Sequence, residues 1–153
     1  MSTPRPRAAV AAVLITLTLP LTLMAAPAQA QSPDRYEDQA RVVTNNKRDG
    51  HDLARFRKGA CVQRFAERQA RRMARQERMY HQDLGKVMRR CNLSTAGENV
   101  AYGYPTGRRV VQAWMRSQGH RRNILNGRFR LLGMAAARDN DGTMYAAQVF
   151  GRH

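Results

Sequence analysis

The chain has 153 residues, of which 27 are Lys or Arg and 11 are Asp or Glu, so its formal net charge is +16. This length indicates one domain and leaves too little chain for a second core. The charge favours anionic partners such as wall polymers, lipid headgroups or nucleic acid. The predominance of Arg over Lys, however, is equally typical of a GC-rich genome.

The first 30 residues are typical of a secretory signal peptide. Arg5 and Arg7 form a positive start, and residues 8–26 carry no charge. Ala28-Gln29-Ala30 then places small residues at the two positions where signal peptidase requires them. We therefore expect cleavage after Ala30 and a secreted protein, either extracellular or periplasmic.

A retained membrane anchor is the alternative, because the uncharged run is nearly long enough to cross a bilayer. Pro20 within the run argues against an anchor, so we expect no stable span once the signal is removed. The remaining chain, residues 31–153, is predicted to be a single domain. Its formal charge is +14, since residues 1–30 contain two basic and no acidic residues.

Both cysteines, Cys61 and Cys91, lie in the predicted mature chain. An even number in an exported protein indicates a disulfide, which on the chain-entropy model would contribute roughly 3–4 kcal/mol. Two free buried thiols are the alternative. A zinc site is disfavoured, because no His lies near either cysteine at ligand spacing.

Helical periodicity is clearest in the first half of the mature chain. Residues 36–48 are predicted to form a helix that stops at Asp49-Gly50, and residues 59–80 a longer one. The longer helix has an apolar face and an opposite basic face, which is either simply solvated or an anionic-partner face. That face comprises Arg64, Arg68, Arg71, Arg75 and Arg78.

The middle of the chain has weaker signals. Residues 82–97 are predicted to be irregular and 97–107 mostly loop. Thr106 is expected to cap a helix that buries Trp114 and ends at Gly119. A further short helical turn is expected over residues 121–126.

The end of the chain predicts an antiparallel hairpin. Residues 131–137 and 143–150 have strand-like composition, and the turn signal Asp139-Asn140-Asp141-Gly142 separates them. Helices on both sides of a small antiparallel sheet would bury these faces, so the predicted fold class is α+β.

Several segments in fixed order together resemble the CAP/SCP superfamily, the cysteine-rich secretory, antigen-five and pathogenesis-related group, and in particular its bacterial members. The resemblance covers nearly all of residues 36–151. The matching segments are Asn45-Asn46-Lys47-Arg48 with Leu53, residues 66–73 with His81, Gly97-Glu98-Asn99-Val100-Ala101, the block from Val110 to Leu125, Leu132-Gly133-Met134, and residues 145–151.

The resemblance implies an α-β-α sandwich with a shallow cleft that can hold a divalent metal. The family's metal-binding positions correspond to His81, Glu98 and His120, with Tyr145 and Gln148 expected to line the cleft. Zinc is the favoured ion, since imidazole and carboxylate groups suit it. Two departures weaken the site. Ser117 stands where eukaryotic members have a second glutamate, and Tyr145 where they have a histidine.

Each site residue also has a structural interpretation that the sequence leaves open. His81 could cap a helix end, Glu98 could bind backbone amides of the Gly-rich segment, and His120 could be a hydrogen-bonded turn residue. Trp114 is expected in the core. Gln148 would face the core or the cleft, depending on the strand register.

We expect a monomeric binding module for a lipid, an envelope component or a host factor rather than an enzyme, because no nucleophile motif such as G-x-S-x-G is present. The alternative is a metal-assisted hydrolase of an envelope substrate that uses His81, Glu98 and His120. An anionic envelope polymer is a further expected partner through the basic helix face, and nucleic acid is disfavoured.

Overall fold

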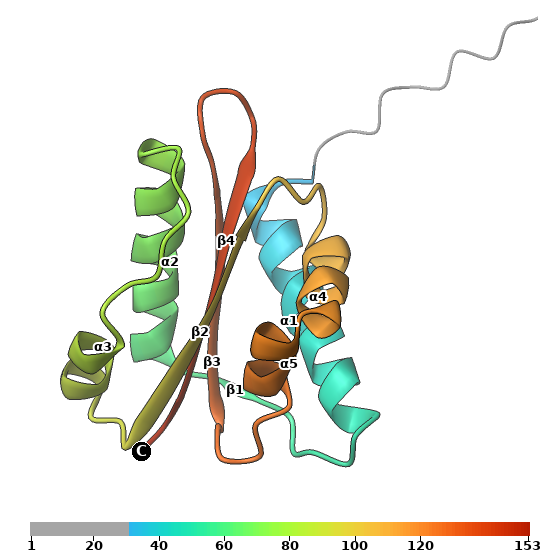
Figure 1. Ribbon diagram of the computed structural model, residues 1–153, viewed down its shortest axis with the longest axis vertical. Helices are drawn as coiled ribbons and strands as arrows, with labels where there is room; N and C mark the ends of the chain where they lie inside the picture. Colours follow the sequence, from blue (N-terminus) through green and yellow to red (C-terminus); the bar gives the residue numbers. More distant parts are fainter. Residues whose placement is uncertain (1–30) are drawn as a thin grey trace, which may run out of the picture.

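The computed structural model describes residues 31–153, so the predicted signal peptide and its cleavage site lie outside the described residues. Figure 1 shows three layers, with α2 and α3 on one side of a sheet and α1, α4 and α5 on the other. This α-β-α sandwich confirms the predicted fold class. The elements are α1 Pro33–Asp49, β1 Arg57–Lys58, α2 Ala60–Arg75, α3 Leu84–Cys91, β2 Thr95–Tyr102, α4 Gly107–Arg116, α5 Gln118–Ile124, β3 Leu131–Arg138 and β4 Met144–Arg152.

The sheet has the strand order β1-β3-β4-β2. The predicted hairpin is confirmed, since β3 and β4 pair antiparallel and the turn between them places Gly142 at a positive φ of 83°. β2 pairs antiparallel with the other side of β4, and the two-residue β1 pairs parallel with β3. The sheet is therefore antiparallel except for this short parallel pair, which the sequence did not predict.

The predictions for residues 82–97 and 97–107 were largely wrong. The first range contains α3, whose ends are fixed by two caps: Asp83 accepts a hydrogen bond from the Lys86 amide, and Asn92 adopts a left-handed conformation. Both ranges contribute to the strand β2. Most of β2 is buried, so its sequence lacks the alternation of a half-exposed strand.

Two helix boundaries also differ from expectation. α2 ends at Arg75 rather than near residue 80, and Gln69 donates from its side chain to the Tyr80 carbonyl, 2.6 Å away, which ties down the following segment. Gly119 lies inside α5 instead of ending α4, which stops at Arg116. The Thr106 cap is confirmed by its bond from the Arg109 amide.

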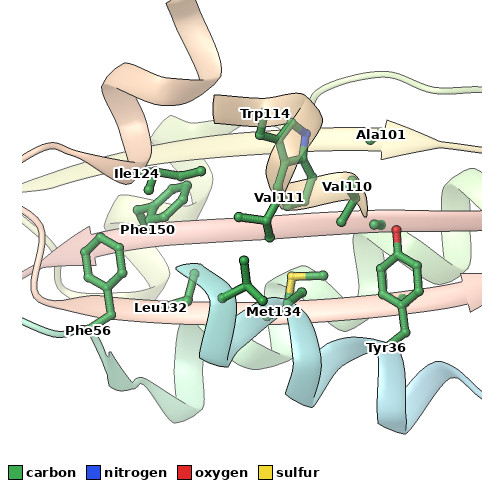
Figure 2. Packing of buried hydrophobic residues seen from close by; sticks show 14 of the residues in the cluster. Tyr36, Phe56, Ala101, Val110, Val111, Trp114, Ile124, Leu132, Met134 and Phe150 are labelled. Carbon is green, nitrogen blue, oxygen red and sulfur yellow. The ribbon is translucent and has the colours of Figure 1, made fainter. Parts of the chain in front are cut away.

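Each face of the sheet has its own core. Figure 2 shows the core beneath α1, α4 and α5, where Trp114 is buried as expected and donates through its indole nitrogen to the Val100 carbonyl. The second core lies beneath α2 and α3 and includes Met73 and Val87. Within residues 31–153, no helix combines the length and apolar character needed to cross a membrane.

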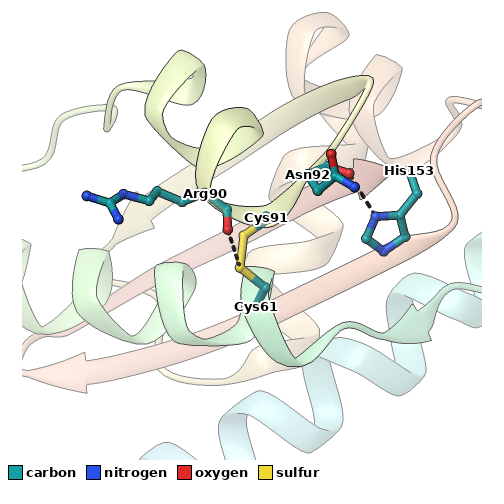
Figure 3. Close-up of a disulfide and its surroundings, with 5 residues drawn as sticks. All are labelled: Cys61, Arg90, Cys91, Asn92 and His153. Carbon is teal, nitrogen blue, oxygen red and sulfur yellow. Dashed lines mark hydrogen bonds between the residues drawn. A yellow bond between two sulfur atoms is a disulfide. The ribbon is translucent and has the colours of Figure 1, made fainter.

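The predicted disulfide between Cys61 and Cys91 is present and links α2 to α3 (Figure 3). It joins the first turn of α2 to the last residue of α3. The bond therefore fixes two helices that share one face of the sheet.

Candidate functional site

A buried carboxylate organises the candidate site. Glu98 lies in β2, and its side chain is only 1% exposed. One carboxylate oxygen, Oε2, accepts from His81 Nδ1 at 2.7 Å and from the backbone amide of Gln82 at 3.2 Å. The other, Oε1, accepts from the Gln82 side-chain amide at 2.6 Å. His81, Gln82 and Glu98 form what we call the Glu98 cluster.

The geometry of the cluster indicates which ring nitrogen of His81 donates to Glu98. A carboxylate can only accept, so Nδ1 must carry the proton that points at Glu98. In the neutral ring, Nε2 then keeps its lone pair, and the His81 side chain is 60% exposed. His81 therefore lies on the segment after α2 as an accessible, oriented imidazole, and it does not cap that helix.

His120 is positioned by two side-chain amides, the partly buried Asn123 and the fully buried Asn99, which connect α5 to β2. Asn123 in α5 donates to the Glu98 carbonyl and to the Asn99 side chain, both at 2.9 Å. Asn99 donates in turn to the His120 carbonyl at 3.2 Å. These bonds attach the His120 backbone to the strand that carries Glu98.

The surroundings of His120 favour its neutral form. Burial lowers the pKa of His120, and the neighbouring His81 lowers that pKa further. The His120 ring also lies 6.4 Å from the Trp114 ring, measured between centroids. The fold therefore brings His81, Glu98 and His120 to one region.

A small cavity of about 250 Å³ adjoins His120. Most of its wall is apolar or aromatic, with His120 and Ser117 as polar groups. Tyr102 on the rim is exposed and stacks on Tyr145 at 5.5 Å between ring centroids. The lining residues are Met79, Val100, Ala101, Tyr102, Tyr104, Ala113, Trp114, Ser117 and His120.

The two residues expected to line the cleft lie deeper. Tyr145 is 3% exposed and lies beneath Tyr102. Gln148 is fully buried in the core, where it accepts from Asn99 and donates to Thr44. The strand register thus settles the open question for Gln148 in favour of the core.

The metal-binding set is smaller than the resemblance implied. Among residues 31–153, no group of three or more His, Cys, Asp or Glu side chains could hold a metal ion. Glu98 directs its two oxygens at three N–H donors and its side chain is only 1% exposed, so it orients His81 and has little access to an ion. The two imidazoles are the remaining candidate ligands.

The five arginines of the predicted basic face do not share one set of neighbours in the folded chain. Arg71 pairs with Glu67 at 3.6 Å, and the Arg78 guanidinium lies 5.0 Å from the Tyr80 ring centre. Arg75 is exposed. The remaining two, Arg64 and Arg68, line a groove between α2 and α3. The structure therefore gives these five residues different surroundings.

Several residues of the site were missed from the sequence. Gln82 makes two of the three bonds to Glu98 but lies in an irregular segment without a pattern. Asn99 and Asn123 did have a signal, because both stand within the segments that carry the family resemblance. Their role depends on a contact between β2 and α5, which spacing alone does not show.

Comparisons with known proteins agree with this fold. The model of the cysteine-rich secretory protein family, CAP, matches residues 43–150, which is more than half of the chain. A solved structure of an extracellular protein containing a SCP domain, from Bacillus anthracis str. Ames, has a TM-score of 0.68 and 26% identity. The match covers 79% of this chain and 41% of that one.

Two further relatives extend the comparison. The solved structure of an outer surface protein from Borrelia burgdorferi has a TM-score of 0.68 at 17% identity, covering 74% of this chain and 89% of that one. The YkwD protein of Bacillus subtilis (strain 168) is 45% identical over 58 residues, which are 38% of this chain and 22% of that protein. The matched part thus spans less than half of the YkwD and B. anthracis proteins. The extent of the family match shows that the chain belongs to the cysteine-rich secretory protein (CAP) family.

Proposed function

We propose that this protein is an exported binding module whose cleft holds a small amphipathic ligand beside an exchangeable divalent metal ion. The observation that carries the proposal is the 2.7 Å bond between His81 Nδ1 and Glu98, next to an apolar cavity that ends at His120. Outer-sphere carboxylates of this kind orient metal-binding imidazoles.

The donor set suits zinc or a related ion held weakly. His81 and His120 would bind the ion, and Glu98 would keep His81 in the tautomer that metal binding needs. Two protein ligands leave the other coordination positions to water or a bound molecule. Such an ion would supply an electrophilic centre for an oxygen atom of the ligand.

The cavity favours a ligand with an apolar body. Its walls include Trp114, Tyr104 and Met79, whereas its polar groups gather at His120 and Ser117. Its volume of about 250 Å³ lies below the ~300 Å³ at which pockets begin to hold drug-sized molecules. A lipid chain segment or a single ring with a polar end fits these dimensions and this polarity.

Binding is favoured over catalysis because the Glu98 side chain is only 1% exposed and so has little access to a substrate as a base. Its three N–H partners occupy both oxygens in a nearly closed environment. Loss of a metal-dependent hydrolytic activity in both His81→Ala and His120→Ala would instead establish the hydrolase alternative.

Export is part of the proposal. The disulfide is typical of oxidising compartments outside the cytosol. The B. anthracis neighbour is described as extracellular and the Borrelia neighbour as an outer surface protein. Both descriptions match the signal-like sequence of residues 1–30.

Trp114 is the single tryptophan of the chain and reports directly on the cleft. Titration with Zn²⁺ should change its fluorescence in the wild type, and His120→Ala should abolish the change. His51→Ala, at an exposed histidine outside the site, should leave the change intact. An unchanged signal in the wild type, or a change that persists without His120, would contradict metal binding here.

The ligand is tested separately by native mass spectrometry of protein purified without chelators. We expect a copurified small molecule that is lost when Ala113→Trp fills the cavity. A ligand retained by that variant would place the binding site elsewhere.

A further inference from the structure

A large hollow with a strong positive charge lies between α2 and α3, on the opposite side of the sheet from His120. It has a volume of about 690 Å³ and is open to solvent. Five of its nine lining residues are basic and one is acidic. The lining residues are Cys61, Arg64, Phe65, Arg68, Arg72, Gln82, Asp83, Lys86 and Arg90, and we call this hollow the basic groove.

The cations stand in two regular rows. On α2, Arg64, Arg68 and Arg72 follow each other at intervals of four residues, which is a rise of about 6 Å per step. On α3, Lys86 and Arg90 have the same interval. Each helix thus supplies one row to the groove, and Arg72 was not among the residues that the sequence singled out.

The positive charge of the groove is not neutralised from within the described part of the chain. None of its five basic side chains belongs to an ion pair there, whereas Arg55, Arg71 and Arg89 each lie within 4.0 Å of a carboxylate. The one acidic residue, Asp83, uses a carboxylate oxygen to cap α3. The groove therefore offers five cations to an external anion.

The two walls are held at a fixed separation. The Cys61–Cys91 disulfide joins them, and Figure 3 shows Arg90 beside it. Arg68 is further positioned over the Phe65 ring, 4.3 Å from its centre. A preformed groove loses less conformational entropy on binding than a set of independent surface side chains.

We propose that the basic groove binds one strand of a linear polymer that carries repeated phosphate groups. Planar guanidinium groups bind phosphate through paired hydrogen bonds, and evenly spaced cations match anions that repeat along a chain. The exposed large apolar side chains, Val42, Met79 and Tyr102, lie outside the groove lining. A concave, polar site of this kind fits a strand better than a flat membrane.

The test compares two variants of equal net charge. The groove variant carries Arg68→Gln, Arg72→Gln and Lys86→Gln. The control carries Arg108→Gln, Arg109→Gln and Arg122→Gln, three exposed positions on α4 and α5 across the sheet. Each variant loses three positive charges, so net charge alone would weaken both equally.

The probe is fluorescently labelled short-chain inorganic polyphosphate, with binding followed by anisotropy over a range of salt concentrations. We expect the groove variant to bind on the order of ten- to a hundredfold more weakly and its salt dependence to fall, and the control to stay close to wild type. Thermal melting and the mass of the intact disulfide check that both variants fold.

Three results would overturn the proposal. One is an equal loss in both variants, which would indicate binding through net charge. Another is absence of polyphosphate binding by the wild type. The third is tighter, groove-dependent binding to vesicles of equal parts phosphatidylglycerol and phosphatidylcholine, which would make the partner a membrane. His120→Ala, in α5 on the opposite side of the sheet from the groove, should leave polyphosphate binding unchanged, so a failure of this test is distinguishable from a failure of the proposed cleft.

Discussion

Replacement of Glu98 by Gln tests the Glu98 cluster most directly. The substituted amide keeps the shape of the side chain and one oxygen, which can still accept from His81 Nδ1 and the Gln82 amide. The Gln82 side chain can rotate to present its own oxygen to the new NH₂ group. All three hydrogen bonds can therefore still form in the variant, but none of them is then made to a charged carboxylate.

The cost follows from that loss. Hydrogen bonds to charged groups contribute about 1.5–3 kcal/mol each, against about 0.5–1.5 kcal/mol for neutral ones. Three weakened bonds cost about 3 kcal/mol in total, and relief from burying a charge offsets part of it. We expect Glu98→Gln to lower the free energy of unfolding by about 2 kcal/mol and Tm by roughly 8 °C.

Guanidinium chloride unfolding at neutral pH, followed through Trp114 fluorescence, measures this difference. Glu77→Gln, at an exposed carboxylate, is the matched control and should change stability by less than about 0.5 kcal/mol. An effect of Glu98→Gln no larger than that of the control would refute the view that this carboxylate is held by three N–H donors.

Three further predictions concern the scaffold. Gly133→Ala would drive a Cβ into the Val62 backbone of α2 and should cost more than about 2 kcal/mol in urea unfolding, whereas Gly119→Ala meets nothing within 4 Å and should be neutral or slightly stabilising. Replacing Cys61 and Cys91 by Ser should lower stability by about 3–4 kcal/mol, and a loss below about 1 kcal/mol would contradict a constraining role for the disulfide. Burial raises the pKa of the Glu37 carboxyl group, so the folded state holds the carboxyl proton more tightly than the unfolded state does. The free energy of unfolding should therefore fall as pH rises from the unfolded pKa of Glu37 through its folded pKa. Glu37→Gln should remove that part of the pH dependence, and parallel stability–pH curves for the wild type and the variant would count against this prediction.

The parts of the fold that could be predicted are those whose pattern is local. α1 and most of α2 have clear periodicity because each buries one face against the rest of the domain, and turn residues mark the β3–β4 hairpin. β2 could not be recognised in this way. It is an edge strand, but helices cover both of its faces, so its buried residues follow each other without polar alternation.

Gly97 shows why the Gly-rich segment was misread as a loop. A Cβ at this position would lie 2.9 Å from the Phe129 ring, so the glycine is required by close packing within a strand. The same residue type is typical of turns, and the sequence contains no local sign that separates the two cases. Only the long-range pairing of β2 with β4 does so.

The sequence singled out the residues of the candidate site but left their roles open. The family resemblance implied that His81, Glu98 and His120 are metal ligands, and binding to backbone amides was the alternative for Glu98. Whether a carboxylate can bind a metal depends on how many N–H groups already approach it, and two of the three donors to Glu98 come from Gln82. Because Gln82 lies in an irregular segment, its sequence context does not predict the two hydrogen bonds that it donates to Glu98. The consequence is chemical: under the proposed function, two imidazoles would act as ligands and one carboxylate would orient His81, so a metal ion would complete its coordination sphere with water or with the ligand itself.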